Sequence, residues 1–351
     1  MTVESAGRMA SMRVAVVGAT GAVGREMLRI LEERSFPLDQ LIPLASPRSE
    51  GVRISFRREE HRIRALSIEA VREADLALFS AGASISREII PDAAAAGTVC
   101  IDNSSAFRRE PGVPLVIPEI NGDSLRSSPR IVSNPNCTAI TVLMAVGPLH
   151  RDTNLVQMVV SSYQSVSGAG RRAVRELAEQ TEKLHGMEED LIHPDPASLP
   201  VGDVFDKTIA FNVLALQGGL DEDDWTGEER KLLHESRKIL DAPELEVQAT
   251  VVRVPVVTGH SAAIYGRFAR PVTPEWARSV LGRAPGVRVV DDPEAGEYPA
   301  PLDAAGIDDV LVGRIRPAAV REDALLLFAS GDNLRKGAAL NAIQIAERLF
   351  S

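Results

Sequence analysis

The sequence predicts an α/β protein in which a Rossmann-like, doubly wound parallel sheet is joined to an α+β domain with an open, largely antiparallel sheet. Three observations support this. A β-branched run leads through a glycine turn into a helical pattern near the N-terminus, strands and helices then alternate, and longer strands with alternating apolar residues follow. The chain has 351 residues, enough for two domains that each bury a core.

The predicted elements fall into two stretches of the chain that differ in their pattern of apolar residues. Strands are expected at 13–17, 41–45, 75–79 and 98–102, with helices after the glycine turn and at 86–96. The pattern changes from about residue 137: a helix is expected at 138–150, then strands at 156–163, 247–254 and 262–268, with an irregular excursion at 186–204 rich in Pro, Asp and Glu. A last helix, 334–350, has apolar residues at helical spacing and is expected to pack on the first domain.

These elements predict the domain boundaries. The nucleotide-binding domain is expected to comprise 12–136 with 332–351, and a catalytic and dimerisation domain to comprise 137–331. Residues 1–11 are small and polar and lack the apolar core of a signal peptide, so a disordered extension is expected there.

Composition excludes several classes of protein. A formal charge of −10 argues against a nucleic-acid surface, which needs clustered Lys and Arg. No apolar run reaches the roughly 18 residues of a membrane helix. The two cysteines can form no disulfide framework, and no CxxC pair indicates a metal site, so a cytoplasmic protein without a metal is expected.

The turn GATGAVG predicts a nucleotide site. Gly18, Gly21 and Gly24 stand between a strand and a helix, where missing side chains let the backbone approach a pyrophosphate at the helix N-terminus. The spacing is GxxGxxG and matches the common fingerprint only in part. The alternative is a turn that merely connects a strand to a helix.

The end of the second strand favours NADP over NAD. An NAD enzyme usually places Asp or Glu there, whereas Arg accommodates the additional phosphate of NADP. The strand runs into LASPRSEG, which offers Ser46, Arg48 and Ser49 before the first carboxylate, Glu50. The alternative is an exposed turn with an incidental arginine.

Cys137 is the candidate nucleophile. It stands in SNPNCTAI, where a helix is expected to begin, and a helix N-terminus favours the thiolate and can also hold an oxyanion. The alternative is a buried, inert thiol, which Cys100 in the apolar strand TVCID is expected to be.

Arg253 and His260 lie in RVPVVTGHS. Strand alternation places Arg253 on the same face as Val247 and Val251, and a guanidinium on an apolar face needs an anion. A substrate carboxylate and a structural salt bridge both remain open. His260 follows a glycine turn; its unperturbed pKa of about 6.5 suits proton transfer, although a lone loop histidine can also be incidental.

Glu228 and Lys231 are three residues apart on an expected helix. Thr226 can cap this helix, with Glu229 completing a capping box. On the residues alone, Glu228 and Lys231 are a solvated ion pair.

With these residues in place, the chain resembles the bacterial aspartate-semialdehyde dehydrogenase family over nearly its whole length. The resemblance rests on the order and spacing of GATGAVG, ALFSAG, IDNSSAFR, VIPEIN, SNPNCTAI, SYQSVSGAG, GEERK, RVPVVTGHS, VGRIR and DNLRKGAALNAIQIAE. One departure is the stretch 211–226, FNVLALQGGLDEDDWT, where the family more often has Pro and then His or Gln soon after FNV. That stretch contains none of the proposed catalytic groups.

The resemblance implies roles for matching residues. Cys137 would be the nucleophile, His260 the general acid/base, and Gln164 the residue that orients the substrate or acyl intermediate. The substrate's phosphate would bind Arg108, Asn136 and Lys231, its carboxylate Arg253, and its amino group Glu228. NADP would contact Gly18, Thr20, Gly21, Ala22, Val23, Gly24, Ser46, Arg48, Ser49, Ser80, Gly82, Ser167, Gly168, Gly170 and Asn333.

The resemblance also implies a reaction and an assembly. A homodimer would interconvert L-aspartyl 4-phosphate plus NADPH with L-aspartate 4-semialdehyde, phosphate and NADP through a thioester, in biosynthesis of lysine, diaminopimelate, methionine and threonine. Two alternatives remain: an enzyme like N-acetylglutamyl-phosphate reductase, whose acetylated substrate has no ammonium for Glu228, and a non-catalytic nucleotide-binding homologue, which would be expected to lack the thiol.

Overall fold

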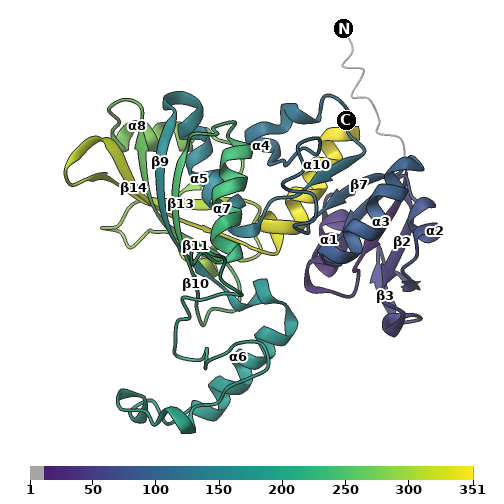
Figure 1. Ribbon diagram of the computed structural model, residues 1–351, viewed down its shortest axis with the longest axis horizontal. Helices are drawn as coiled ribbons and strands as arrows, with labels where there is room; N and C mark the ends of the chain where they lie inside the picture. The colour runs from purple at the N-terminus through teal and green to yellow at the C-terminus, as the bar shows by residue number, and fades with distance from the viewer. Residues whose placement is uncertain (1–11, 351) are drawn as a thin grey trace. The chain divides into compact units, whose positions relative to one another are not determined.

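The computed structural model describes residues 12–350, and the chain divides into two compact units (Figure 1). Unit 1 comprises the residues up to 136 together with 238–241 and those from 337 onward, and unit 2 comprises 137–237 and 242–336. The extension expected at 1–11 lies outside the described residues.

Unit 1 is built on a parallel sheet of six strands in the order β5-β2-β1-β6-β7-β8. Numbered by their succession within this sheet, the strands run 3-2-1-4-5-6, which is the order of the doubly wound dinucleotide-binding fold. The predicted fold class of this unit is therefore confirmed. The strands are β1 (Met12–Val17), β2 (Leu38–Ala45), β5 (Arg64–Ala65), β6 (Leu76–Phe79), β7 (Val99–Asp102) and β8 (Ile131–Ser133).

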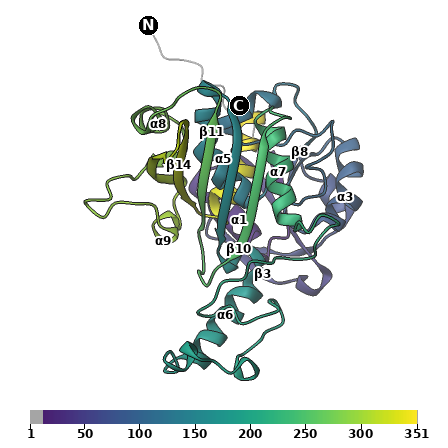
Figure 2. The same cartoon turned by 60° about the vertical axis from the view of Figure 1, so that its left-hand side comes forward.

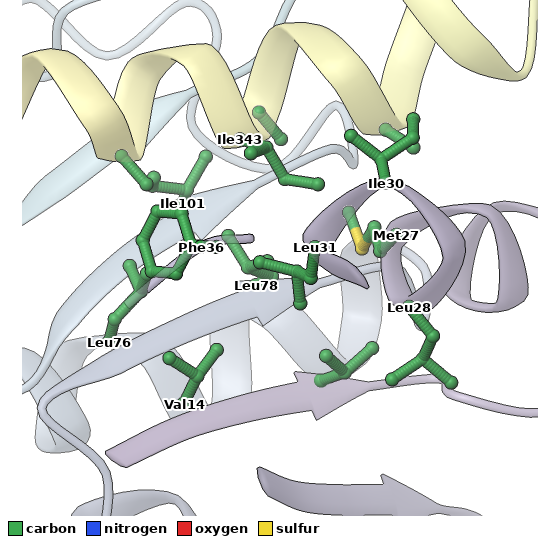
Figure 3. Packing of buried hydrophobic residues seen from close by; sticks show 14 of the residues in the cluster. Val14, Met27, Leu28, Ile30, Leu31, Phe36, Leu76, Leu78, Ile101 and Ile343 are labelled. Carbon is green, nitrogen blue, oxygen red and sulfur yellow. The ribbon is translucent and has the colours of Figure 1, made fainter. Parts of the chain in front are cut away.

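The core of unit 1 joins the sheet to the first and last helices of the chain. Figure 3 shows Leu31 of α1 and Ile343 of α10 over Val14 and Leu78 of the sheet, and all four side chains are fully buried. The last helix thus packs where its spacing predicted, although α10 begins only at Leu340, after a π-helical turn at Arg335–Ala339. The helices are α1 (Ala22–Glu33), α2 (Ile68–Arg72), α3 (Ala83–Ala95), α4 (Pro118–Asn121) and α10 (Leu340–Phe350).

A small hairpin of β3 (Arg53–Phe56) and β4 (Glu59–Arg62) also belongs to unit 1. Sequence patterning did not predict it, because both strands are only four residues long and β4, EEHR, has no apolar residue.

Unit 2 contains a six-stranded mixed sheet in the order β10-β9-β11-β14-β13-β12. The three central pairings are antiparallel, and the outermost pair at each edge is parallel. The prediction of a largely antiparallel sheet is therefore confirmed for the four central strands, whereas the parallel pairs at the two edges were not predicted. The strands are β9 (Leu155–Gln164), β10 (Glu246–Arg253), β11 (His260–Phe268), β12 (Val287–Val289), β13 (Val310–Ala318) and β14 (Arg321–Gly331).

Helix α5 packs against the centre of this sheet, as Figure 2 shows for the strands around β11. Its buried residues run almost without interruption, as a helix covered on several sides requires. Helix α6 follows the end of β9 and leads into the irregular stretch predicted at 186–204, which holds only two short 3₁₀ turns. The helices are α5 (Cys137–Thr153), α6 (Arg171–Leu184), α7 (Gly227–Ile239), α8 (Pro274–Leu281) and α9 (Pro301–Ala304).

Within residues 12–350, no helix is both long and apolar enough to cross a lipid bilayer.

Candidate functional site

The glycine turn of unit 1 has no room for side chains at two of its positions. Gly18 has φ of +87°, and a Cβ there would lie 2.5 Å from the carbonyl oxygen of Ser80. A Cβ on Gly24 would lie 2.2 Å from the carbonyl oxygen of Gly18. Both obstacles are backbone atoms, so this tight passage from β1 to α1 requires glycine.

The turn opens at the point where the strand order of the sheet reverses. Gly18, Ser46 and Ser80 directly follow β1, β2 and β6, which are neighbours in the sheet. No side chain caps the N-terminus of α1 at Gly21, and its first turn carries no acid. Free amides at a switch point suit a pyrophosphate, so the residues fit a dinucleotide. Arg48 is exposed in the 3₁₀ turn Pro47–Ser49.

Arg108 of unit 1 is anchored by backbone carbonyls. It is 7% exposed; its Nε donates to the carbonyl of Asn134 at 2.9 Å and its Nη2 to that of Asn103 at 2.7 Å. The Nζ of Lys238 in turn donates to the Arg108 carbonyl at 2.9 Å. Asn136, also expected to bind phosphate, is 9% exposed in the same unit.

Cys137 is the first residue of α5 and is partly exposed, as a nucleophile must be. Cys100, in contrast, is fully buried in β7, and burial raises the pKa of its thiol to about 12. The contrast predicted between the two thiols is therefore present. Gln164 ends β9 and donates from Nε2 to Oγ1 of Thr138 at 2.6 Å, which ties the end of this strand to the first turn of α5.

Arg253 ends β10 and pairs in register with Gln164 of β9. Its Nη1 donates to the carbonyl of Ser165 at 2.7 Å and its Nη2 donates to Oε1 of Gln217. Burial lowers the pKa of Arg253, while the charges of Cys137 and Glu228 raise it. Nε is buried and has no hydrogen-bond partner among residues 12–350. A buried cation with an unused donor in the fork is suited to a carboxylate ligand.

His260 begins β11 and is 1% exposed. Its Nδ1 lies 3.1 Å from both the amide nitrogen and the Oγ of Ser165, whereas its Nε2 has no hydrogen-bond partner in the described part of the chain. Burial, and then the charge of Arg253, lower the pKa of His260 to about 3. The unperturbed pKa of about 6.5 that the sequence suggested therefore does not apply to His260, because burial disfavours the charged ring.

Gly168 and Asn333 complete this polar cluster in unit 2. A Cβ on Gly168 would lie 3.1 Å from His260 Nε2 and 3.2 Å from Arg253 Nη1, so glycine keeps the space beside both nitrogens open. Asn333 is 2% exposed, and its Oδ1 accepts from the amide of Gly259 at 2.9 Å. Of the remaining expected cofactor residues, Ser167 and Gly170 also lie in unit 2.

Glu228 and Lys231 form an ion pair on the first turns of α7. The predicted capping box is confirmed: the amide of Thr226 donates to Glu229 at 2.8 Å, and the amide of Glu229 donates to Thr226 Oγ1 at 3.3 Å. The box fixes where α7 begins and thereby the direction of both charged side chains.

Two residues of this cluster were not predicted from the sequence. Ser165 contacts His260, and Gln217 contacts Arg253, but neither had a recognisable role in the linear pattern. Gln217 belongs to the unusual stretch 211–226, which also forms a β-bridge between Leu214 and Arg253. The divergent stretch therefore contacts Arg253, a proposed substrate-binding residue. One indication of this contact was visible beforehand, since the family more often has His or Gln soon after FNV.

Family models match both halves of the chain. The model described as semialdehyde dehydrogenase, NAD binding domain, matches residues 13–128. The model described as semialdehyde dehydrogenase, dimerisation domain, matches residues 146–336.

Curated relatives align with almost the whole sequence. An aspartate-semialdehyde dehydrogenase of Aquifex aeolicus is 46% identical over 96% of this chain and 97% of its own length. One of Bacillus subtilis is 43% identical over 96% of this chain and 97% of its own length.

Solved structures share the fold. Aspartate semialdehyde dehydrogenase II from Vibrio cholerae, complexed with ASA, has a TM-score of 0.90 and 38% identity, covering 97% of this chain and 98% of its own. A probable aspartate-semialdehyde dehydrogenase from Pseudomonas aeruginosa has a TM-score of 0.85 and 33% identity, covering 97% and 98%.

Proposed function

Because this chain belongs to the semialdehyde dehydrogenase family, we propose that it is an NADP-dependent, phosphorylating aspartate-semialdehyde dehydrogenase. It would interconvert L-aspartyl 4-phosphate and L-aspartate 4-semialdehyde plus phosphate, in biosynthesis of lysine, diaminopimelate, methionine and threonine. Relatives at 43–46% identity over nearly the full chain bear that enzyme name.

The observation that carries the proposal is the position of Cys137. It stands partly exposed at the N-terminus of a 17-residue helix, and the charge of Arg253 acts on it. A thiolate is stabilised both by the dipole of a helix at its N-terminus and by a nearby cation. These are the conditions under which a cysteine becomes a nucleophile toward an acyl phosphate.

In the proposed reaction the sulfur of Cys137 adds to the acyl carbon of aspartyl phosphate. The carbon–oxygen bond to phosphate breaks, phosphate leaves with the bonding electrons, and a thioester remains on the enzyme. When bound, NADPH would supply a hydride to the acyl carbon. The carbon–sulfur bond would then break, so that Cys137 leaves as the thiolate and the aldehyde is released. Gln164, held by Thr138 beside the start of α5, would orient the acyl group.

Substrate recognition divides three charged groups among fixed partners. Arg253 would take the α-carboxylate through its buried fork, and Glu228 the ammonium group. Arg108, Asn136 and Lys231 would bind the phosphate. Each proposed partner has the opposite charge or a hydrogen-bond donor for the group that it would bind.

The cofactor is proposed to be NADP, held by the glycine turn and the ends of β2 and β6. Ser46, Arg48 and Ser49 follow β2, where an NAD enzyme would present a carboxylate. The other proposed contacts are Gly18, Thr20, Gly21, Ala22, Val23, Gly24, Ser80, Gly82, Ser167, Gly168, Gly170 and Asn333.

We also propose a homodimer, formed through the region that matches the dimerisation-domain model. A cytoplasmic location is part of the same proposal, since Cys100 and Cys137 form no disulfide with each other, as in a reducing compartment.

The test is a phosphate-dependent NADP reduction assay with aspartate semialdehyde, run beside N-acetylglutamate semialdehyde. Aspartate semialdehyde should be strongly preferred, because Glu228 and Arg253 would read its free ammonium and carboxylate. Preference for the acetylated substrate would instead support an N-acetylglutamyl-phosphate reductase.

Cys137→Ala checks the covalent mechanism in the same assay. Activity should fall by far more than tenfold, because a tenfold loss corresponds to only about 1.4 kcal/mol of barrier. A variant that kept activity within tenfold of the wild type would exclude the thioester.

A further inference from the structure

A cavity of about 590 Å³ borders Arg253 in unit 2. This volume falls within the roughly 300–1,000 Å³ that small-molecule sites usually occupy. Two stretches of the chain, 204–207 and 213–218, form most of its wall. The apolar side chains of the wall are Val204, Phe205, Val213, Leu214 and Leu216. The proposed substrate contacts include Arg253 but none of these apolar groups, so the proposed substrate leaves this wall unused.

The wall of the cavity exposes apolar surface that a ligand could cover. Val213 and Leu216 are 59% and 55% exposed, although both line the cavity. Apolar side chains that gather around one hollow mark a binding groove, whereas exposed apolar residues scattered singly need no explanation. Covering the wall would remove apolar surface from water, which favours a ligand with an apolar chain.

The polar end of the cavity lies at Arg253 and Gln217, which both line it. Arg253 is only 8% exposed, and its Nη2 donates to Oε1 of Gln217. Arg253 Nε and Gln217 Nε2 are buried, and neither has a hydrogen-bond partner between residues 12 and 350. A carboxylate that parted the two side chains would accept from both donors. Lys207 and Asp206, exposed on the wall, contribute one charge of each sign, so the buried Arg253 makes an anion the favoured ligand.

The first stretch of the wall is fixed by buried acceptors on α6. Glu176 accepts from the amides of Val204 and Phe205 at 2.8 and 3.2 Å. One turn later on the same helix, Gln180 accepts from the amide of Ile209 at 2.8 Å. Both acceptor side chains are buried, so these bonds are shielded from competition with water.

The second stretch of the wall is fixed to β10. The amide of Leu214 donates to the carbonyl of Arg253 at 2.9 Å, and the amide of Arg253 donates to the carbonyl of Leu214 at 2.8 Å. This pair of bonds holds the backbone just before Leu216 and Gln217. Since both stretches are held in place by the fold, a ligand would need to order little of the wall, which favours binding.

We propose that this cavity binds a short aliphatic carboxylate, with the carboxylate held by Arg253 and Gln217 and the apolar chain against the wall. The two parts of the ligand match the two parts of the cavity, a buried cation with unused donors and exposed apolar side chains. Arg253 is also the proposed partner of the substrate's carboxylate, so the ligand excludes the substrate while it is bound. This competition rests on the proposed function, whereas the site itself is independent of it.

Ligand-observed NMR titration of the whole wild-type protein tests the site without turnover. Isocaproate is the probe, isocaproamide keeps its shape but lacks the charge, and acetate keeps the carboxylate but lacks the chain. Isocaproate should bind at least about tenfold more tightly than acetate, because several more carbon atoms leave water. It should also bind more tightly than isocaproamide, which cannot form an ion pair with a guanidinium. Equal affinity of isocaproate and either control, or no binding of isocaproate at all, would refute the proposal.

Leu216→Asn removes an apolar part of the wall and leaves Arg253 in place. It should weaken isocaproate binding by roughly fivefold or more, since a buried apolar contact is lost, and leave acetate binding unchanged. Leu220→Asn is the matched control, because Leu220 is 51% exposed in the stretch 211–226 but does not line the cavity, so neither affinity should change. If Leu216→Asn bound isocaproate as tightly as the wild type does, the apolar chain would not lie in this cavity and the proposal would be wrong.

Kinetics separate this proposal from the proposed function. In the phosphate-dependent assay, isocaproate should raise the KM for aspartate semialdehyde linearly with its concentration and leave kcat unchanged. A lowered kcat with an unchanged KM would show that the ligand does not use Arg253, and would overturn the proposal. A protein that bound isocaproate as expected but did not oxidise aspartate semialdehyde would refute the proposed function and support the site.

Discussion

At the scale of single residues, the contact of Gln217 with Arg253 has a consequence for substrate affinity. The Oε1 of Gln217 accepts from Arg253 Nη2, while Gln217 Nε2 and Arg253 Nε are both buried without protein partners. A carboxylate that entered between them would satisfy both donors. Gln217 should therefore help to hold the substrate carboxylate although it lies in a divergent stretch.

Gln217→Glu should raise the KM for aspartate semialdehyde by at least about tenfold, with a smaller change in kcat, because a fixed carboxylate would occupy the guanidinium. Steady-state kinetics measure both constants. Gln248→Glu, an exposed substitution on β10, is the matched control and should leave KM unchanged. An unaltered KM in the Gln217 variant would show that this contact is only structural.

The two thiols should differ in reactivity. Cys100 is fully buried with a pKa raised to about 12, so it stays protonated at pH near neutrality, whereas Cys137 is partly exposed at a helix N-terminus. Iodoacetamide on the folded protein should modify Cys137 alone, as peptide mass spectrometry would show. Labelling of Cys100 before unfolding would contradict its burial.

The raised pKa of Cys100 also determines how the stability of the folded state changes with pH. The folded state keeps a proton that the free thiol loses above 9.0, so this residue's contribution to stability is complete below that pH and is lost as pH rises toward about 12.

At the scale of elements, the capping box of α7 links stability to substrate binding. Thr226→Ala removes the acceptor for the Glu229 amide, and loss of such a cap typically costs about 1 kcal/mol. Because Glu228 and Lys231 lie in the first turns of this helix, KM should rise together with the loss in the free energy of unfolding.

Thr273→Ala is the matched control for this prediction. Thr273 caps α8 by accepting from the amide of Trp276 at 3.2 Å, and α8 carries none of the proposed site residues. Urea denaturation should show a similar loss of stability in both variants, with a raised KM only in Thr226→Ala. Equal KM values would mean that fraying of α7 does not reach the ion pair.

The same scale shows what the sequence could predict. Strand and helix patterns placed β1, β9, β10 and α5 within a few residues, because β1 and α5 are apolar along nearly their whole length and β9 and β10 bury alternate residues. The mixed pairing at both edges of the second sheet could not be read in this way, since burial patterns do not distinguish parallel from antiparallel neighbours. The π-helical turn at Arg335–Ala339 was also not predicted, because its sequence, RKGAA, does not distinguish π-helical from α-helical hydrogen bonding.

In the candidate site, motif residues were predicted, but contacts between distant segments were not. Cys137 begins a helix, Gln164 and Arg253 each end a strand, and His260 begins one, so all four stand at element boundaries that the sequence indicates. Ser165 contacts His260 through its backbone amide, so no pattern of side chains in the sequence indicates this contact. Gln217 lies 36 residues before Arg253, and only the β-bridge of Leu214 brings it there.

At the scale of the whole molecule, nucleotide choice can be measured apart from catalysis. A ligand at a hundredfold its Kd stabilises the folded state by about 2.7 kcal/mol, and a dinucleotide bound at the glycine turn would act through unit 1. Thermal unfolding of Cys137→Ala protein, in which no turnover is expected, therefore reports binding alone. NADP should raise the Tm more than an equal concentration of NAD, because Arg48 supplies a cation where the β2 end presents no acid before Glu50.

Arg48→Ala should remove most of the difference between the Tm shifts caused by NADP and NAD. The smaller Tm shift caused by NAD should remain, since the pyrophosphate would still bind the turn. Arg72→Ala, another exposed arginine of unit 1 on α2, controls for the loss of a positive charge and should preserve the preference for NADP. If NAD and NADP raised the Tm of the Cys137→Ala protein with Arg48 intact by the same amount, Arg48 would not select the cofactor.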